Sequence, residues 1–371
     1  MTDAKRNGIR RLTGCVVAFG ALLAAAATNP GCGGGAGNTS MTSGSSVVSG
    51  VSSSSGGTGG TGGTGGMSCN SGAFQAKLAP GANGGFTDAF DATPNAHGTT
   101  VYFTAIDAKG APGVLKQDIC PAGAVSTVFT GGAFEAPFGI SIGTDDATLY
   151  VADLSAAEDA TDTTGAKDKG ALFSLPAAGG AAPTILVASV APRGVTVVRE
   201  NGADQVYFTG FDKANKKPGV FKVAAAGGAV TVLAEGPPFS DPAGVVVSSS
   251  GDIYVVDTSG STSQLGNIIV VKGGSATELV PNLQVGYPAG IAITQDDKQL
   301  LVSGMNPSAT SDVLFLVDVA TQVVTNNTTS IGGFGEAAGL HRAHKADVFA
   351  WADTKAKPMG LTGTGTVFVI K

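Results

Sequence analysis

Four short segments of the same pattern recur along the chain at a spacing of about 50 residues. Each reads proline, a variable residue, glycine, and then valine or isoleucine, and the segments begin at Pro137, Pro192, Pro242 and Pro288. Successive prolines are separated by 55, 50 and 46 residues. A repeat of this length indicates an array of similar small units, each of which buries its apolar faces against its neighbours.

Each unit contains three or four short apolar runs rich in β-branched and aromatic residues, a composition typical of β-strands. A tyrosine recurs in the second run of successive units, as Tyr102, Tyr150, Tyr207 and Tyr254. Glycine pairs such as Gly227-Gly228 separate the third run from the fourth and indicate tight turns. Units of four short strands on this period predict the blades of an all-β propeller.

Counting the units predicts six blades: one that opens near Phe86, four with the proline pattern, and one at Ala338-Gly339-Leu340. The third strand of the last unit, residues 366–370, is followed only by Lys371. We therefore expect residues 74–78 to supply the missing outer strand and to close the ring. Closure removes sheet edges that would otherwise promote aggregation.

The first 68 residues differ from the repeats. A basic segment containing Arg10 and Arg11 precedes an apolar run, Val16 to Ala27, of signal-peptide length. This run is too short to span a bilayer. Residues 33–68 contain no charged or aromatic side chain and cannot form a core. We expect a signal peptide at 1–31, a disordered Gly/Ser/Thr-rich linker at 32–68 and a propeller at 69–371.

Gly31-Cys32, followed by a glycine-rich run, resembles a bacterial lipoprotein signal. The resemblance implies a lipid on Cys32. The alternative is simple cleavage after residues 25–27, which would give a secreted protein with three cysteines. Lipidation of Cys32 leaves Cys69 and Cys120 to pair as a disulfide, whereas simple cleavage leaves an odd thiol in an oxidising compartment.

Removal of residues 1–31 would change the formal charge from −6 to −9, because this segment carries four basic residues and Asp3. An acidic chain is a poor match for nucleic acid or an anionic lipid surface, which attract basic patches. We therefore expect a monomer that contacts the membrane only through its lipid. Its expected location is the bacterial cell envelope, either in the periplasm or exposed at the surface.

Residues 242–257, PAGVVVSSSGDIYVVD, resemble an NHL repeat, and residues 288–303, PAGIAITQDDKQLLVS, resemble the gluconolactonase-like group of six-bladed propellers. The resemblance implies the fold over residues 73–371. In lactonases an asparagine or aspartate between the proline and the glycine often binds a metal at the channel mouth. The corresponding residues here are Phe138, Arg193, Ala243, Ala289 and Ala338, and only Asp88 in the first unit offers an oxygen. One carboxylate falls far short of the roughly six to eight oxygens of a calcium site.

Asp153, Asp257 and Asp353 stand at one register position in alternate units. They form either a three-fold set of carboxylates for a cation such as calcium, or loop caps that accept backbone N–H bonds. His341 and His344 form the sole close histidine pair, and we expect a solvated hairpin there because residues three apart on a strand face opposite ways. The residues expected at the channel mouth, as a ligand site or a plain solvated rim, are Asp88, Glu135, Arg193, Asp241 and Glu336.

No catalytic residue stands out in this pattern, so we expect a binding or scaffold module rather than an enzyme. Its partner would be an envelope protein, a peptide or a polysaccharide. The alternative is a metal-dependent hydrolase or lyase of the lactonase type.

Overall fold

The structure is a computed structural model that describes residues 77–80, 85–119, 123–156, 169–188, 190–258, 265–286, 288–306, 311–327, 337–355 and 365–370. The expected signal peptide and linker lie outside these residues, as do Cys32, Cys69, Cys120 and Glu336. No helix in the described ranges is long and apolar enough to cross a membrane.

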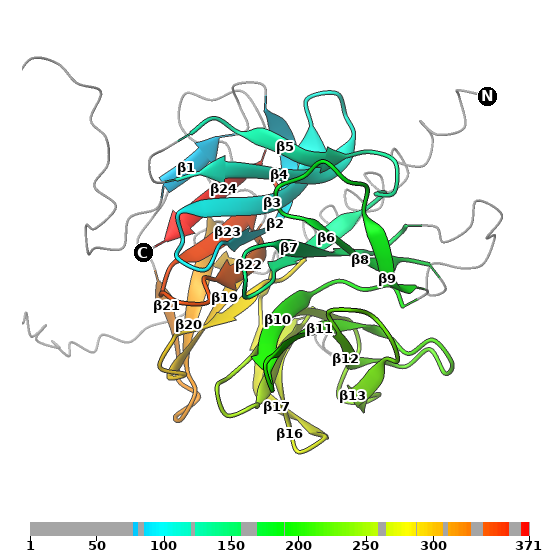
Figure 1. Cartoon of the computed structure of the whole chain (residues 1–371). Helices are drawn as coiled ribbons and strands as arrows, with labels where there is room; N and C mark the ends of the chain where they lie inside the picture. Colours follow the sequence, from blue (N-terminus) through cyan, green and yellow to red (C-terminus); the bar gives the residue numbers. More distant parts are fainter. Residues whose placement is uncertain are drawn as a thin grey trace, which may run out of the picture. The chain divides into compact units, whose positions relative to one another are not determined.

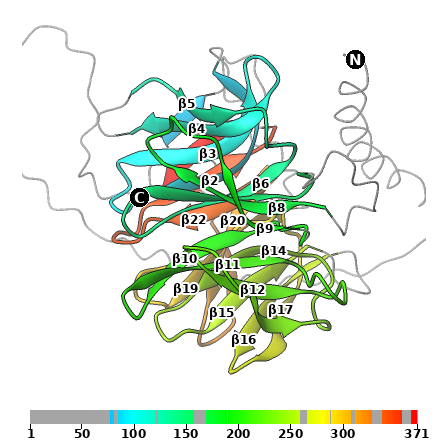
Figure 2. The ribbon, with the colours of Figure 1, turned by 45° about the vertical axis from the view of Figure 1, so that its right-hand side comes forward.

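The described residues form six four-stranded antiparallel sheets, which are the blades of a six-bladed β-propeller, as predicted (Figures 1 and 2). Blades 1 to 3 are β2 (Phe86–Pro94), β3 (Thr100–Asp107), β4 (Pro112–Asp118), β5 (Ser126–Thr130); β6 (Pro137–Ile142), β7 (Thr148–Asp153), β8 (Ala171–Pro176), β9 (Thr184–Ala188); and β10 (Val195–Glu200), β11 (Ala203–Phe211), β12 (Pro218–Ala224), β13 (Thr231–Glu235). Blades 4 to 6 are β14 (Pro242–Val247), β15 (Ile253–Asp257), β16 (Gly266–Lys272), β17 (Ser275–Leu283); β18 (Ile291–Ile293), β19 (Gln299–Asn306), β20 (Ser311–Asp318), β21 (Val324–Asn327); and β22 (Ala337–Arg342), β23 (Phe349–Asp353), β24 (Thr366–Ile370), β1 (Lys77–Pro80).

The ring closes in the sixth blade, where the first strand of the chain pairs with the last. β1 lies antiparallel to β24, with Lys77 opposite Val369 and Pro80 opposite Thr366 (Figure 1). The prediction that an N-terminal strand closes the last blade is confirmed. The observed strand is Lys77–Pro80, two to three residues later than the predicted 74–78, of which 74–76 lie outside the described residues.

The apolar core is divided among the blade interfaces. Within the described residues each of the six pairs of neighbouring blades encloses its own buried cluster. The cluster between blades 5 and 6, for example, contains Trp351 and Phe368 of blade 6, whose ring centroids lie 5.2 Å apart, together with Leu301 and Leu314 of blade 5. No blade buries its faces alone, so each blade depends on its neighbours for the burial of its apolar side chains.

The glycine of the repeated pattern allows the inner strands to approach closely at the axis. A Cβ atom on Gly194 would lie 2.1 Å from the Ala243 carbonyl oxygen of the next blade, and one on Gly290 would lie 2.1 Å from the Leu340 nitrogen. Such separations are impossible for real side chains, so every equivalent position in blades 2 to 6 must be glycine. These positions are Gly139, Gly194, Gly244, Gly290 and Gly339.

The outer edges of the first four blades carry a repeated irregularity. The pairing between the third and fourth strands skips one residue of the outer strand, which bulges at Val128, Leu186, Leu233 and Leu279. The glycine turn of the following blade lies against several of these bulges: a Cβ on Gly179 would be 3.0 Å from the Val128 oxygen. Bulges and covering turns both protect sheet edges from pairing with other chains.

Substituting Gly194 with alanine tests the close approach at the axis. We expect Gly194→Ala to lower the free energy of unfolding by about 1–3 kcal/mol, because the added methyl must displace the inner strand of blade 4. Equilibrium unfolding in urea measures this loss. Gly85→Ala is the matched control, since its Cβ would meet Val125 at an ordinary 3.5 Å. Equal stability of the two variants would contradict the explanation.

Candidate functional site

The central channel is narrow and is lined mostly by the backbone of the inner strands. One cavity on the axis has a volume of about 10 Å³, which is room for about one water molecule. Three polar side chains reach it, namely those of Asp91, Arg193 and His341. The remaining lining residues are Phe138, Gly194, Ala243, Gly244, Pro288, Ala289, Gly290, Gly339 and Leu340.

Strand register shows that Asp91 takes the place of the axial glycine in blade 1. Asp91 is opposite Thr104 in the neighbouring strand, as Gly139 of blade 2 is opposite Ala152. The variable position between proline and glycine is therefore Phe90, whose ring centroid lies 5.2 Å from that of Phe138. The sequence alignment that put Asp88 there was wrong, because the register of β2 shifts between Thr87 and Asp91.

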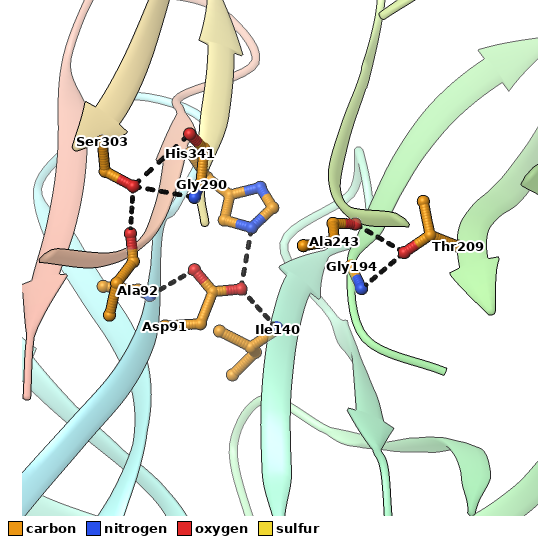
Figure 3. A network of polar contacts seen from close by, with 10 residues as sticks. Asp91, Ala92, Ile140, Gly194, Thr209, Ala243, Gly290, Ser303 and His341 are labelled. Atoms are coloured by element: carbon orange, nitrogen blue, oxygen red, sulfur yellow. Dashed lines mark hydrogen bonds and ion pairs between the residues drawn. The ribbon is translucent and has the colours of Figure 1, made fainter. Parts of the chain in front are cut away.

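Asp91 joins three blades through one buried carboxylate (Figure 3). Its Oδ1 accepts a bond from the Ala92 N–H at 2.8 Å, and its Oδ2 accepts one from the Ile140 N–H of blade 2 at 2.8 Å. The same Oδ2 lies 2.9 Å from Nε2 of His341 in blade 6. The side chains of His341 and Asp91 are only 10% and 4% exposed.

The solvated hairpin expected at the two neighbouring histidines is wrong for His341, which is buried on β22, whereas His344 lies half-buried in the turn that follows. His341 is buried in the channel against Asp91, and Nε2 of His344 lies 2.9 Å from the carbonyl oxygen of Ile142 in blade 2. The two side chains therefore contact different groups. The burial of His341 could not be seen in the sequence, which shows only that both histidines lie near a predicted strand end.

Buried hydroxyls tie other blades together at the axis. Oγ1 of Thr209 accepts a bond from the Gly194 N–H of its own blade and donates to the Ala243 carbonyl of the next (Figure 3). Ser303 does the same with Gly290 and the carbonyl of Ala338. These hydroxyls belong to blades 3 and 5, and Thr104 stands at the same register position in blade 1.

The end of the propeller where the inner strands begin, here called the mouth face, holds most of the residues predicted to bind a ligand. Arg193 and Asp241 form an ion pair with an Nη1–Oδ2 distance of 2.6 Å, and their side chains are 13% and 25% exposed. Thr258 donates to the same Asp241 oxygen at 2.7 Å. Glu135 is exposed, and Glu336 lies outside the described residues.

Asp88 lies apart from this pair, on the irregular part of β2 beside blade 6. Its backbone has a φ of 48°, and its side chain is half-buried. Burial raises the pKa of the Asp88 carboxyl, while a hydrogen bond from Thr87 and the charge of Lys355 oppose that rise. The structure therefore brings together Arg193 and Asp241 but not the full predicted set.

The alternating aspartates accept backbone hydrogen bonds. Asp153 accepts four, from the N–H groups of Glu135, Ala136, Ser155 and Ala156, at 2.8–3.0 Å. Burial raises the pKa of its carboxyl, and the four amides oppose that rise. These are the bonds that the capping interpretation predicts, and they join the end of the second strand to the loop that enters the first.

The other two aspartates at this register position also accept hydrogen bonds from backbone N–H groups. Asp257 accepts the N–H bonds of Ser240 and Asp241 at 2.8–3.0 Å, and Asp353 accepts that of Lys355 at 3.0 Å. All three carboxylates are almost completely buried. The Asp257 bonds also fix the backbone beneath the Arg193–Asp241 ion pair.

The donor set offered by the described residues does not fit a calcium or transition-metal centre. The variable positions of the repeat carry Phe90, Phe138, Ala243, Ala289 and Ala338, which have no side-chain ligand atoms, and Arg193, which is a cation. Across the described ranges no three His, Cys, Asp or Glu side chains are grouped closely enough to hold a metal ion.

Comparisons with known proteins agree with this architecture. Residues 239–265, which include β14 and β15, match the NHL repeat. A gluconolactonase from Xanthomonas campestris is similar in structure, with a TM-score of 0.52 and 14% identity over 78% of this chain and 88% of that one. A protein of unknown function from Bacteroides thetaiotaomicron gives a TM-score of 0.53 and 13% identity over 79% of this chain and 72% of that one. No curated protein sequence matches the chain.

The chain is thus a six-bladed β-propeller that contains an NHL repeat. At 13–14% identity the likeness to the two solved structures concerns the fold alone.

Replacing Asp153 with asparagine tests the structural role of the buried carboxylates. The new NH₂ group would face backbone N–H donors, so we expect Asp153→Asn to lower the free energy of unfolding by about 1–3 kcal/mol. Glu135→Gln is the control, because Glu135 is exposed and should change stability by no more than about 0.5 kcal/mol. Urea unfolding of both variants gives the comparison. A neutral Asp153→Asn substitution would mean that these amides do not depend on the carboxylate.

Proposed function

We propose that this propeller is a non-enzymatic binding or scaffold module of the bacterial cell envelope, held there by a lipid on Cys32. The observation that supports the proposal is that the polar side chains of the channel bond to other groups of the protein. The carboxylate of Asp91 accepts bonds from two backbone amides and contacts His341, and Arg193 is paired with Asp241. These groups hold blades together rather than facing a substrate-sized space.

The small cavity at the axis supports a partner that binds outside the channel. A cavity of about 10 Å³ admits about one water molecule and excludes a sugar ring or a peptide side chain. A peptide, protein or polysaccharide would therefore contact the mouth face, where Glu135 is exposed and the Arg193–Asp241 pair is within reach of solvent.

Binding of the full chain to purified peptidoglycan sacculi and to isolated envelope polysaccharide, measured by co-sedimentation, tests this proposal. We expect Glu135→Ala and Asp241→Asn to weaken binding in a graded manner, because binding energy is spread over several contacts. Asp296→Ala is the control, since Asp296 lies in the hairpin between β18 and β19 at the opposite end of the strands. Binding that is indifferent to the mouth-face variants would count against this face.

Metal content separates the binding module from the alternative hydrolase. We expect no stoichiometric metal in elemental mass spectrometry of the full chain after dialysis without chelator. One calcium or zinc per chain, together with near-complete loss of a hydrolytic turnover on a single substitution at Asp88 or Asp241, would overturn the proposal in favour of a metal-dependent enzyme.

Anchoring depends on one thiol. We expect Cys32→Ser to move the protein from the membrane fraction to the soluble fraction of bacterial cells, because a signal without this cysteine cannot receive the lipid. Fractionation followed by immunoblotting measures the change, and Cys120→Ser is the control. Retention of the Cys32→Ser variant in membranes would contradict lipid anchoring.

A further inference from the structure

The interface between blades 1 and 6 differs from every other interface at the axis. In blades 2 to 6 the axial position is glycine, so these blades offer one another nearly identical backbone surfaces. Blade 1 instead offers the side chain of Asp91, against which Gly339 of blade 6 packs directly. A Cβ on Gly339 would lie 1.9 Å from Oδ1 of Asp91, so blade 6 must have glycine there to receive this carboxylate.

Blade 6 carries the matching group two residues further along the same strand. His341 and Gly339 lie on the same face of β22, since residues two apart on a strand point the same way. At the register position of His341 the other five blades have small or apolar side chains without a titratable group. These residues are Thr93, Ser141, Thr196, Val246 and Ala292.

The Asp91–His341 contact joins residues 250 positions apart, at the interface where the two ends of the ring meet. Elsewhere, successive blades follow one another directly along the chain and pack on their immediate neighbours. The pairing of β1 with β24 brings the two ends of the chain together. At the axis, however, the inner strand of blade 6 must still be matched with that of blade 1 and not with a similar inner strand, including those of a second copy of the protein. A contact between two side chains that occur at no other blade distinguishes the correct partner.

We propose that Asp91 and His341 specify the closure of the ring, by making the contact of blade 6 with blade 1 favourable and its contact with other blades unfavourable. In a wrong closure Asp91 would be buried without His341, and a buried carboxylate that lacks one of its partners is strongly destabilising. Such a buried polar pair selects one arrangement among similar ones. A single buried polar residue fixes the register of a coiled coil in the same way.

Refolding of the full chain from denaturant tests this proposal, with monomer and oligomer fractions measured by size-exclusion chromatography with light scattering. The variants are His341→Ser, which installs the residue type of blade 2 at this position, and Asp91→Gly, which gives six equivalent glycine positions. We expect both to raise the oligomer fraction severalfold relative to the wild type. His341→Gln, which retains an N–H donor toward Asp91, should restore most of the monomer.

Thr209→Val is the matched control, because it removes the axial hydrogen bonds between blades 3 and 4, whose strands follow one another in the chain. It should lower stability without raising the oligomer fraction. The proposal fails if the oligomer fraction depends only on the free energy of unfolding. In that case Thr209→Val would form as much oligomer as an Asp91 or His341 variant of equal stability. The proposal also fails if Asp91→Gly and His341→Ser refold to monomer as fully as the wild type.

Discussion

The closeness of the inner strands at the axis governs the rest of this structure. Gly194 and its counterparts have no room for a methyl group, so blades 2 to 6 meet backbone to backbone at the axis. This contact sets the width of the channel, which is left with room for about one water molecule. It also brings the backbone carbonyl groups of one blade within reach of the blade before it. The hydroxyls of Thr209 and Ser303 donate hydrogen bonds to such carbonyl oxygens of the next blade. Packing and hydrogen bonding at the axis are therefore two aspects of one constraint.

Much of this fold was predictable because its causes are local and repeated. The proline-glycine pattern marks the start of the inner strand, the tyrosine marks the second strand, and the shortage of a fourth strand in the last unit predicts closure by an N-terminal one. The position of that strand was less well predicted, at 74–78 instead of Lys77–Pro80. Short apolar runs can be shifted by a few residues without changing their pattern, and only the pairing with β24 fixes them.

The polar centre was not predicted, and the reason is physical. The register shift between Thr87 and Asp91 hides the correspondence of Asp91 with the axial glycines when blade 1 is aligned from its start. Alignment backwards from Tyr102, which is opposite Thr93, would have placed Asp91 correctly. The contact with His341 depends on the ring being closed, and no spacing within one unit encodes it. Arg193 and Asp241, by contrast, both precede inner strands of successive blades, and the structure brings their side chains together as an ion pair.

The polar residues of the second strands alternate around the ring: blades 1, 3 and 5 have Thr104, Thr209 and Ser303, whereas blades 2, 4 and 6 end these strands with Asp153, Asp257 and Asp353. The true repeating unit is therefore a pair of blades, and the ring has approximate three-fold symmetry. A propeller of this type would tolerate the gain or loss of two adjacent blades more readily than that of one, because a single insertion would place two blades of the same kind side by side. The alternation of these buried side chains therefore favours an even number of blades in such a chain.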